Sequence, residues 1–281
     1  MNLKAAARAA APGAPSRATE ALALLDSASP GNPALATPLR AAHLIGQCAH
    51  ESMGFTRLVE SLYFTTPERL MAVWPRRFAS VAAARGFTRD PERLANQVYG
   101  GRLGNTRPGD GYRYRGRGYL QLTGRANYRR FGARIGIDLE ASPERATEPE
   151  TAWLIAASYL ATRSRSGRTA LEWADADNVE MVTRIVNGGL HGLADRRHRT
   201  AVALAALAGP VLKILRRGDE GPEVLLLQRA LAARGFPPGA LDGDFGPRTE
   251  AALIAFQRQA GLPPGGRAGP PTLAALMPLA A

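Results

Sequence analysis

The sequence predicts a mainly α-helical fold in two domains, a larger one in residues 1–208 and a smaller one in residues 209–281. Apolar residues at positions 41, 44, 45, 48 and 49 have the three-and-four spacing of a helix with one buried face. Helical spacing returns at 224–234 and 248–260, on either side of a turn built from Asp-Gly and Phe-Gly pairs. Gly209-Pro210 lies between the two regions and marks the boundary.

Turn and cap signals divide the larger domain into its elements. Residues 3–29 are expected to form one or two amphipathic helices, followed by a turn at 30–33. Thr37-Pro38 is expected to start the helix that leads to Glu51. Thr66 as cap and Pro67 at the first helical position start another helix, which Trp74-Pro75 ends. Further helices are expected over 91–99, 149–163, 178–186 and 198–207.

Residues 100–124 are dense in glycine, which lets irregular backbone come close to a bound chain. The segment lacks the Gly-Lys-Ser/Thr ending of a phosphate loop, and no apolar strand precedes it. Short strands are expected around 119–122.

The net charge of +12 indicates an anionic partner. From Val211 onward there are eight Lys/Arg and six Asp/Glu, so about +10 of this charge belongs to the first 210 residues. Arginines and tyrosines alternate between Arg102 and Arg134, a pattern that also suits nucleic acid, but no recognised nucleic-acid motif accompanies it. We therefore expect a cell-wall or outer-membrane surface rather than nucleic acid.

Cys48 is the single cysteine, so no intramolecular disulfide can form, and its place in the apolar pattern predicts a buried side chain. No apolar run is long enough to span a membrane. The N-terminus lacks the continuous apolar core of a signal peptide. Histidines and acidic residues do not follow one another at metal-ligand spacing, so neither a metal nor another cofactor is expected.

Glu51 and Glu60 are two carboxylates placed among apolar residues. Glu51 lies at the end of a largely buried helix, and Gly54 allows the chain to turn so that Glu60 folds back across a cleft. One carboxyl in such a cleft can stay protonated while the other stays ionised, so the pair can serve as general acid and general base. The alternative is that Glu51 pairs locally and Glu60 is a solvated surface charge.

His50-Glu51, the small residues after them, Phe55 and the run from Glu60 to Tyr63 resemble the active-site signature of family 19 glycoside hydrolases, the class of plant-type chitinases and many phage endolysins. This resemblance implies a lysozyme-like, α-rich catalytic domain with a few short strands. It also implies that Glu51 is the general acid and Glu60 the general base of an inverting reaction, with carboxyls roughly 6.5 to 9.5 Å apart.

Residues 116–128 resemble a second stretch of the same family. By position Gln121, Thr123 and Asn127 match the glutamine, hydroxyl residue and asparagine that line the cleft and hold the catalytic water and the sugar amides. Thr123 stands where many members have serine, which keeps the hydroxyl. Amide side chains suit N-acetyl sugars because they both donate and accept hydrogen bonds. For each residue the alternative is a turn or structural hydrogen bond.

A third resemblance lies between Asn187 and Arg197. Asn187, followed by two glycines, matches a substrate-binding asparagine, and Arg196 matches an arginine that supports the acid pair. His191 stands where many plant members have glutamate, so the hydrogen-bond network behind the cleft is expected to differ. The disulfides usual in plant chitinases are also impossible here, so packing must stabilise the domain.

The smaller domain resembles the peptidoglycan-binding module found at the ends of many cell-wall hydrolases, a bundle of three helices. The match rests on positions that include Leu215, Gly218, Gly221-Pro222, Leu227-Gln228, Leu231, Leu241-Asp242-Gly243, Phe245-Gly246, Phe256-Gln257 and Gly261-Leu262. Spacing alone would predict only a small helical domain with one tight loop.

Together the resemblances imply an endolysin-like, muramidase-type glycosidase that cuts β-1,4 bonds between N-acetyl sugars of peptidoglycan, acting as a monomer tethered to the wall. A chitinase acting on GlcNAc polymers, a lytic transglycosylase that needs only one acid, and a non-catalytic wall-binding protein remain alternatives. Because the N-terminus does not resemble a signal peptide, we expect the protein to stay in the cytoplasm until a holin or lysis lets it reach the periplasm and wall.

Overall fold

The computed structural model describes residues 1–208 and 214–276, and these residues are mainly helical, as predicted. The predicted boundary at Gly209-Pro210 lies outside the described residues. The helices of the larger part are α1 (Leu3–Ala10), α2 (Ser16–Ala28), α3 (Pro38–Glu51), α4 (Pro67–Val73), α5 (Val81–Arg85), α6 (Pro91–Tyr99), α7 (Asp110–Arg113), α8 (Arg125–Ile135), α9 (Pro149–Thr162), α10 (Ala170–Asp175), α11 (Val179–Asn187) and α12 (Leu193–Ala208). Short 3-10 helices cover Pro33–Leu35 and Pro143–Thr147, and β1 (Ser164–Arg165) pairs antiparallel with β2 (Arg168–Thr169).

Helix α3 lies in the main hydrophobic core, and α12 packs along it. Thr37 caps α3 by accepting a 3.2 Å hydrogen bond from the Arg40 N–H, with Pro38 in the first turn. Gly46 permits the close approach of the two helices, because a Cβ at this position would lie 2.3 Å from Oγ1 of Thr200. Cys48 is fully buried in this core, as the sequence predicted.

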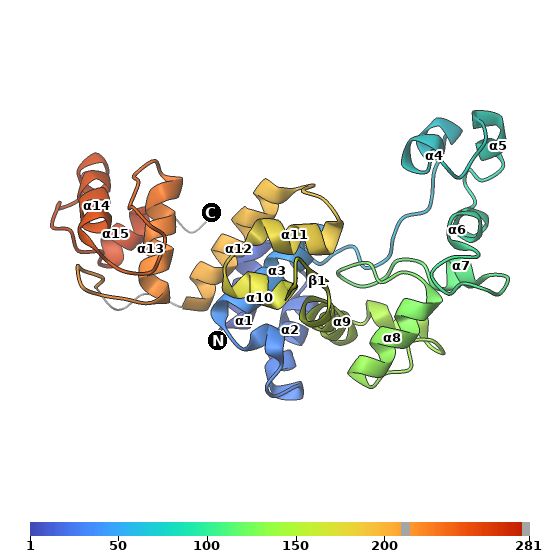
Figure 1. Ribbon diagram of the computed structural model, residues 1–281, viewed down its shortest axis with the longest axis horizontal. Coiled ribbons are helices and arrows are strands. Elements are labelled where there is room, and N and C mark those ends of the chain that lie inside the picture. Colours follow the sequence, from blue (N-terminus) through green and yellow to red (C-terminus); the bar gives the residue numbers. More distant parts are fainter. Residues whose placement is uncertain (209–213, 277–281) are drawn as a thin grey trace.

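A second core lies under α4, α5 and α6, and a third surrounds α8. In Figure 1, α4 to α7 stand at one end of the molecule, away from the central helices. Leu70 of α4 and Leu94 of α6 are fully buried in the second core. We call α4 to α7 the outer lobe. The segment between α3 and α4 carries Glu60 and connects the central core to this lobe.

The C-terminal helices α13 (Pro222–Ala233), α14 (Pro247–Gln259) and α15 (Pro270–Leu276) share a separate core, and Figure 1 shows them at the opposite end from α4 and α5. Buried Gln228 supports the turn between α13 and α14, since its Oε1 accepts from the Gly243 N–H at 2.9 Å and its Nε2 donates to Asp242 at 2.9 Å. Arg229 of α13 forms an ion pair with Asp177, between α10 and α11.

The expected helices are present, with two differences in detail. Helix α12 begins at Leu193 rather than 198, because the loop from Asn187 to Gly192 is short. Around 119–122 the structure has isolated antiparallel bridges, Val59 with Arg117 and Arg117 with Leu122, instead of a named strand. Among the described residues, no helix is both long and apolar enough to cross a membrane.

Candidate active site

The end of α3 turns the chain sharply after Glu51. The Ser52 N–H bonds back to the Cys48 carbonyl, and three successive residues, Met53, Gly54 and Phe55, then adopt positive φ angles of 51°, 69° and 69°. Buried Phe55 anchors this turn, because its ring packs 5.2 Å from that of Trp153 and edge-on against that of Tyr119 at 5.5 Å. The predicted turn at Gly54 is therefore present, and it starts the chain toward Glu60.

Arg196 of α12 holds Glu51 in place. Its Nη2 donates to Oε1 of Glu51, its Nη1 donates to Oε1 of Gln47 at 2.6 Å, and its Nε donates to the His191 carbonyl at 3.0 Å. The Arg196 side chain is only 1% exposed, whereas that of Glu51 is 23% exposed. A buried guanidinium with three acceptors is fixed in orientation, so it presents the carboxyl of Glu51 to solvent in one position.

Glu60 is held by two donors from the outer part of the domain. The Tyr99 hydroxyl at the end of α6 donates to Oε2 at 2.7 Å, and the Gly116 N–H donates to Oε1. The Glu60 N–H in turn bonds to the Gly116 carbonyl at 3.0 Å, which fixes the backbone beside the side chain. Burial and the neighbouring charge of Glu60 raise the pKa of Tyr99, so its phenol remains a neutral hydrogen-bond donor near neutral pH.

Gln121 lies beside Glu60. A Cβ built on Gly116 would lie 2.9 Å from Oε1 of Gln121 and 3.3 Å from the carboxyl of Glu60, so both groups border the same small space. Gln121 itself has φ 53°, unusual for a residue other than glycine, and its Nε2 donates to the Gly118 carbonyl at 3.0 Å. This arrangement leaves Oε1 of Gln121 directed toward the space next to Glu60, as an acceptor.

Thr123 and Asn127 are engaged in local hydrogen bonds. The Thr123 hydroxyl donates to the Gln121 carbonyl at 2.9 Å, and Nδ2 of Asn127 donates to the Thr123 carbonyl at 2.8 Å. These bonds shape the loop that carries Gln121. Asn187 is exposed as the last residue of α11, immediately before Gly188 in a left-handed conformation.

His50 belongs to a polar cluster beside Glu51. Its Nδ1 lies 2.6 Å from Asp195, which also accepts from Nε of Arg199 at 2.7 Å. Burial would raise the pKa of Asp195, but the bonds from His50 and Arg199 outweigh it and lower that pKa. In the described part of the chain, no three His, Cys, Asp or Glu side chains gather as metal ligands.

Two partners of Glu60 were not predicted as site residues. Tyr99 has the ordinary place of a residue at the end of an amphipathic helix, and nothing in the local spacing indicates its bond to Glu60. Gly116 belongs to the glycine-rich segment, whose density predicted a close backbone approach without indicating which glycine makes it. Gln47, behind Glu51, appeared in the sequence only as part of a buried helix.

The site thus combines two carboxyls, each held by its own donors, with neutral amide side chains. A glycosidase that acts on sugars with amide groups uses carboxyls for acid and base catalysis and amide side chains for binding. A glycosyl hydrolase family 19 domain-containing protein of Haemophilus influenzae is 36% identical over 166 residues, which cover 56% of this chain and 75% of that protein. The structure also resembles chitinase C from Streptomyces griseus HUT6037, with a TM-score of 0.50 and 21% identity over 73% of this chain and 76% of that one. The similarity to chitinase C shows only that the two proteins share a fold.

This chain belongs to glycoside hydrolase family 19 and is a glycosidase. The family model for a peptidoglycan binding domain matches residues 220–276, which contain α13, α14 and α15. The chain therefore combines a family 19 catalytic domain with a C-terminal peptidoglycan-binding domain.

Proposed function

We propose that this protein hydrolyses the β-1,4 bonds of the peptidoglycan glycan strand with inversion of configuration. The observation that carries the proposal is the different support of the two carboxyls. Glu51 is bound by Arg196 of α12, and Glu60 is bound by Tyr99 at the end of α6 and by Gly116 in the loop after α7. The supports come from separate parts of the fold, so each carboxyl has its own environment and can have its own role.

In this proposal Glu51 is the general acid. Arg196 engages Oε1, so the proton that is transferred to the leaving glycosidic oxygen is carried by Oε2. Oε2 has no hydrogen bond within the described part of the structure, and the side chain is partly exposed. Arg196 acts as a positioning residue, because its three bonds fix the direction in which the acid points.

Glu60 is the general base. Its carboxylate takes one proton from a water molecule, which attacks the anomeric carbon from the face opposite the leaving group. Oε1 of Gln121 borders the same space, so it can accept the second hydrogen of that water and fix its orientation. Thr123 and Asn127 are proposed to line the adjacent part of the cleft, with Asn187 on the α11 side, where they would bind the acetamido groups.

Peptidoglycan as the substrate is supported by the second domain of the same chain. A wall-binding domain raises the local concentration of wall polymer without adding contacts to the active site. A net charge of +12 adds attraction to anionic wall and outer-membrane surfaces. The Streptomyces griseus relative is a chitinase, so hydrolysis of chitin is the second candidate.

The test is mass spectrometry of fragments released from purified peptidoglycan with reduced and labelled ends, with colloidal chitin in parallel. Reducing-end N-acetylmuramic acid establishes a muramidase, and reducing-end GlcNAc from peptidoglycan a glucosaminidase. Fragments from chitin alone overturn the proposed substrate. Glu51→Gln should abolish release while the protein still sediments with the wall; full activity of Glu60→Gln would instead indicate a lytic transglycosylase.

We further propose an endolysin-like role, in which the protein is held in the cytoplasm and reaches the wall through a holin or on lysis. Support comes from the combination of glycosidase and wall-binding domain in one chain. Fractionation of cells that express the protein without any lysis gene tests this, since protein found outside intact cells would contradict the route. Size-exclusion chromatography with light scattering tests whether the protein is a monomer in solution.

A further inference from the structure

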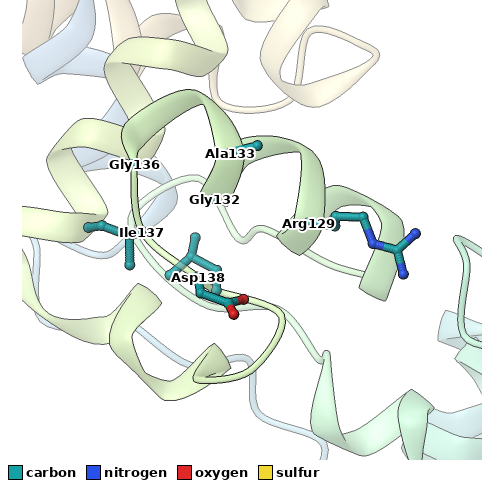
Figure 2. A pocket seen from close by; sticks show the side chains of 7 residues that line it. Arg129, Gly132, Ala133, Gly136, Ile137 and Asp138 are labelled. Carbon is teal, nitrogen blue, oxygen red and sulfur yellow. The ribbon is translucent and has the colours of Figure 1, made fainter.

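Two cavities of similar size lie outside the carboxylate site. The first, about 300 Å³, lies at the C-terminal end of α8 and is shown in Figure 2. Its Arg129 already donates to Glu140 at 2.8 Å, and its Asp138 accepts from the Ala141 N–H at 3.0 Å. The remaining lining is glycine, alanine, isoleucine and leucine, so this cavity offers no unengaged charge to a ligand.

The second cavity, about 350 Å³, lies between the end of α4 and the loop after α6. It is lined by Val73, Trp74, Pro75, Arg76, Arg77 and Arg102. We call it the arginine cavity. Three arginines therefore share the lining with one tryptophan, and they come from the segment after α4 and the loop after α6.

The arginines of this cavity form no ion pair with any residue that the structure describes. Among the described residues, no ion pair involves the side chain of Arg76, Arg77 or Arg102, whereas many other arginines of the domain pair with a carboxylate. The surrounding residues 61–109 contain eight arginines and three acidic residues, so the local field is positive. Unpaired guanidinium groups around a cavity favour an anion, and their planar form suits carboxylates.

Trp74 forms a fixed wall of the cavity. Its ring packs at 64° against Phe64, with centroids 5.3 Å apart, and it joins the edge of the α4–α6 core. The structure shows a half-buried ring that packs inward and also borders the cavity, which gives a sugar an apolar face next to the charges.

The arginine cavity is linked to Tyr99, the residue whose hydroxyl donates to the proposed general base Glu60. Arg102 follows the end of α6, its N–H bonds to the Tyr99 carbonyl at 3.3 Å, and its charge acts on the Tyr99 phenol to lower its pKa, against the larger effects of burial and of Glu60. Nε2 of Gln97, also on α6, contacts the Arg77 carbonyl at 3.5 Å. Helix α6 thus contacts both the cavity, through Gln97 and the segment that carries Arg102, and Glu60, through Tyr99.

We propose that the arginine cavity is an accessory subsite for a carboxylate of the peptidoglycan strand, with the attached sugar against Trp74. The ligand is either a carboxylate of the stem peptide or, on muramic acid that carries no stem peptide, the free lactyl carboxylate. This inference rests on the proposed function and adds a determinant of substrate choice to it. Chitin carries no carboxylate, so occupation of this cavity would favour peptidoglycan over an uncharged GlcNAc polymer.

The test compares Arg76→Gln/Arg102→Gln with the matched control Arg69→Gln/Arg85→Gln. The control removes the same charge from exposed arginines of the same lobe that do not line the cavity. Initial rates of reducing-end release are measured on native peptidoglycan and on peptidoglycan whose carboxyls have been amidated. The cavity variant should lose about tenfold in kcat/KM on native polymer, mainly through KM, and about twofold or less on the amidated polymer.

An equal loss of kcat/KM in both double variants would overturn the proposal, because the effect would then come from the general charge of the protein. An equal loss by the cavity variant on native and amidated polymer would also overturn it, because the effect would then come from misfolding. No loss in the cavity variant would also overturn it. Removal of the stem peptides frees the lactyl carboxylates. A loss on such strands therefore supports the lactyl group as a ligand, and a loss confined to peptide-bearing strands supports the stem peptide. Failure of the proposed function is seen separately, as no fragments from the unmodified protein on native peptidoglycan.

Discussion

The Tyr99 hydroxyl donates a 2.7 Å hydrogen bond to Oε2 of Glu60, across 39 positions of the sequence. Together with the Gly116 N–H, it occupies one lone pair on each oxygen of that carboxylate and fixes its plane. A base held in this way does not have to reorient before it takes a proton from water.

Replacing Tyr99 by Phe should lower kcat about tenfold, because a hydrogen bond to a charged group contributes about 1.5 kcal/mol or more. Steady-state kinetics at neutral pH measure this change. Tyr63→Phe is the control, as Tyr63 is 56% exposed; equal kcat values for the two variants would contradict the role of Tyr99.

Replacing Gly116 by Ala should reduce activity with little change in stability. The added methyl would lie 2.9 Å from Oε1 of Gln121 and 3.3 Å from the Glu60 carboxyl, in the space proposed for the attacking water. We expect kcat to fall at least about 100-fold, as for a misplaced reacting group. The control is Gly13→Ala, where a Cβ would meet nothing within 4 Å. Activity close to that of the unmodified protein would show that the water lies elsewhere.

Replacing Arg196 by Met should destabilise the domain by about 3–5 kcal/mol, because a buried charged group that satisfies Glu51, Gln47 and the His191 carbonyl is removed. Urea denaturation followed by circular dichroism measures the change. Arg197→Met should alter the free energy of unfolding by about 0.5 kcal/mol or less, because Arg197 is 58% exposed and its nearest carboxylate is 3.9 Å away. Equal stability of the two variants would be inconsistent with the buried network.

The pH dependence of stability should include a contribution from Glu140. Hydrogen bonds from Arg129 and Arg125 lower its pKa to about 2. A carboxylate with a lowered folded-state pKa stabilises the fold fully above its unfolded pKa, and this contribution is lost as the pH falls from there toward 2. The difference in the free energy of unfolding between the unmodified protein and Glu140→Gln should therefore be constant near pH 7 and shrink between about pH 4.5 and pH 2.

Urea titrations at pH 7, 4 and 3 would detect this change, with Glu144→Gln as the exposed control. A difference for Glu140→Gln that stays constant down to pH 3 would mean that the arginines do not stabilise the ionised form.

Local sequence signals were sufficient for most of the helices. Threonine followed by proline precedes α3 and α4, and apolar spacing gives the buried faces, because both depend on residues within one or two turns of each other. The expected cap by Thr66 is wrong, because its side chain makes no capping hydrogen bond, whereas Thr37 caps α3. The start of α12 was placed too late. Its first turn contains Asp195 and Arg196, which also contact His50 and Gln47 of α3, and apolar spacing does not reveal these distant partners.

The sequence by itself determined the mainly helical fold, the candidate carboxylates Glu51 and Glu60, and the resemblance to a glycosidase joined to a wall-binding domain. The resemblance also pointed to Arg196 as a support of the acid pair, and the structure shows its bond to Glu51 across 145 positions. Only the tertiary structure decided that Tyr99 holds Glu60 and that Arg76 and Arg102 line one cavity. The physical reason is the separation along the chain over which each kind of interaction acts. Helical spacing and caps depend on neighbours within a few residues, whereas the direction of a carboxyl depends on donors that packing brings from distant helices.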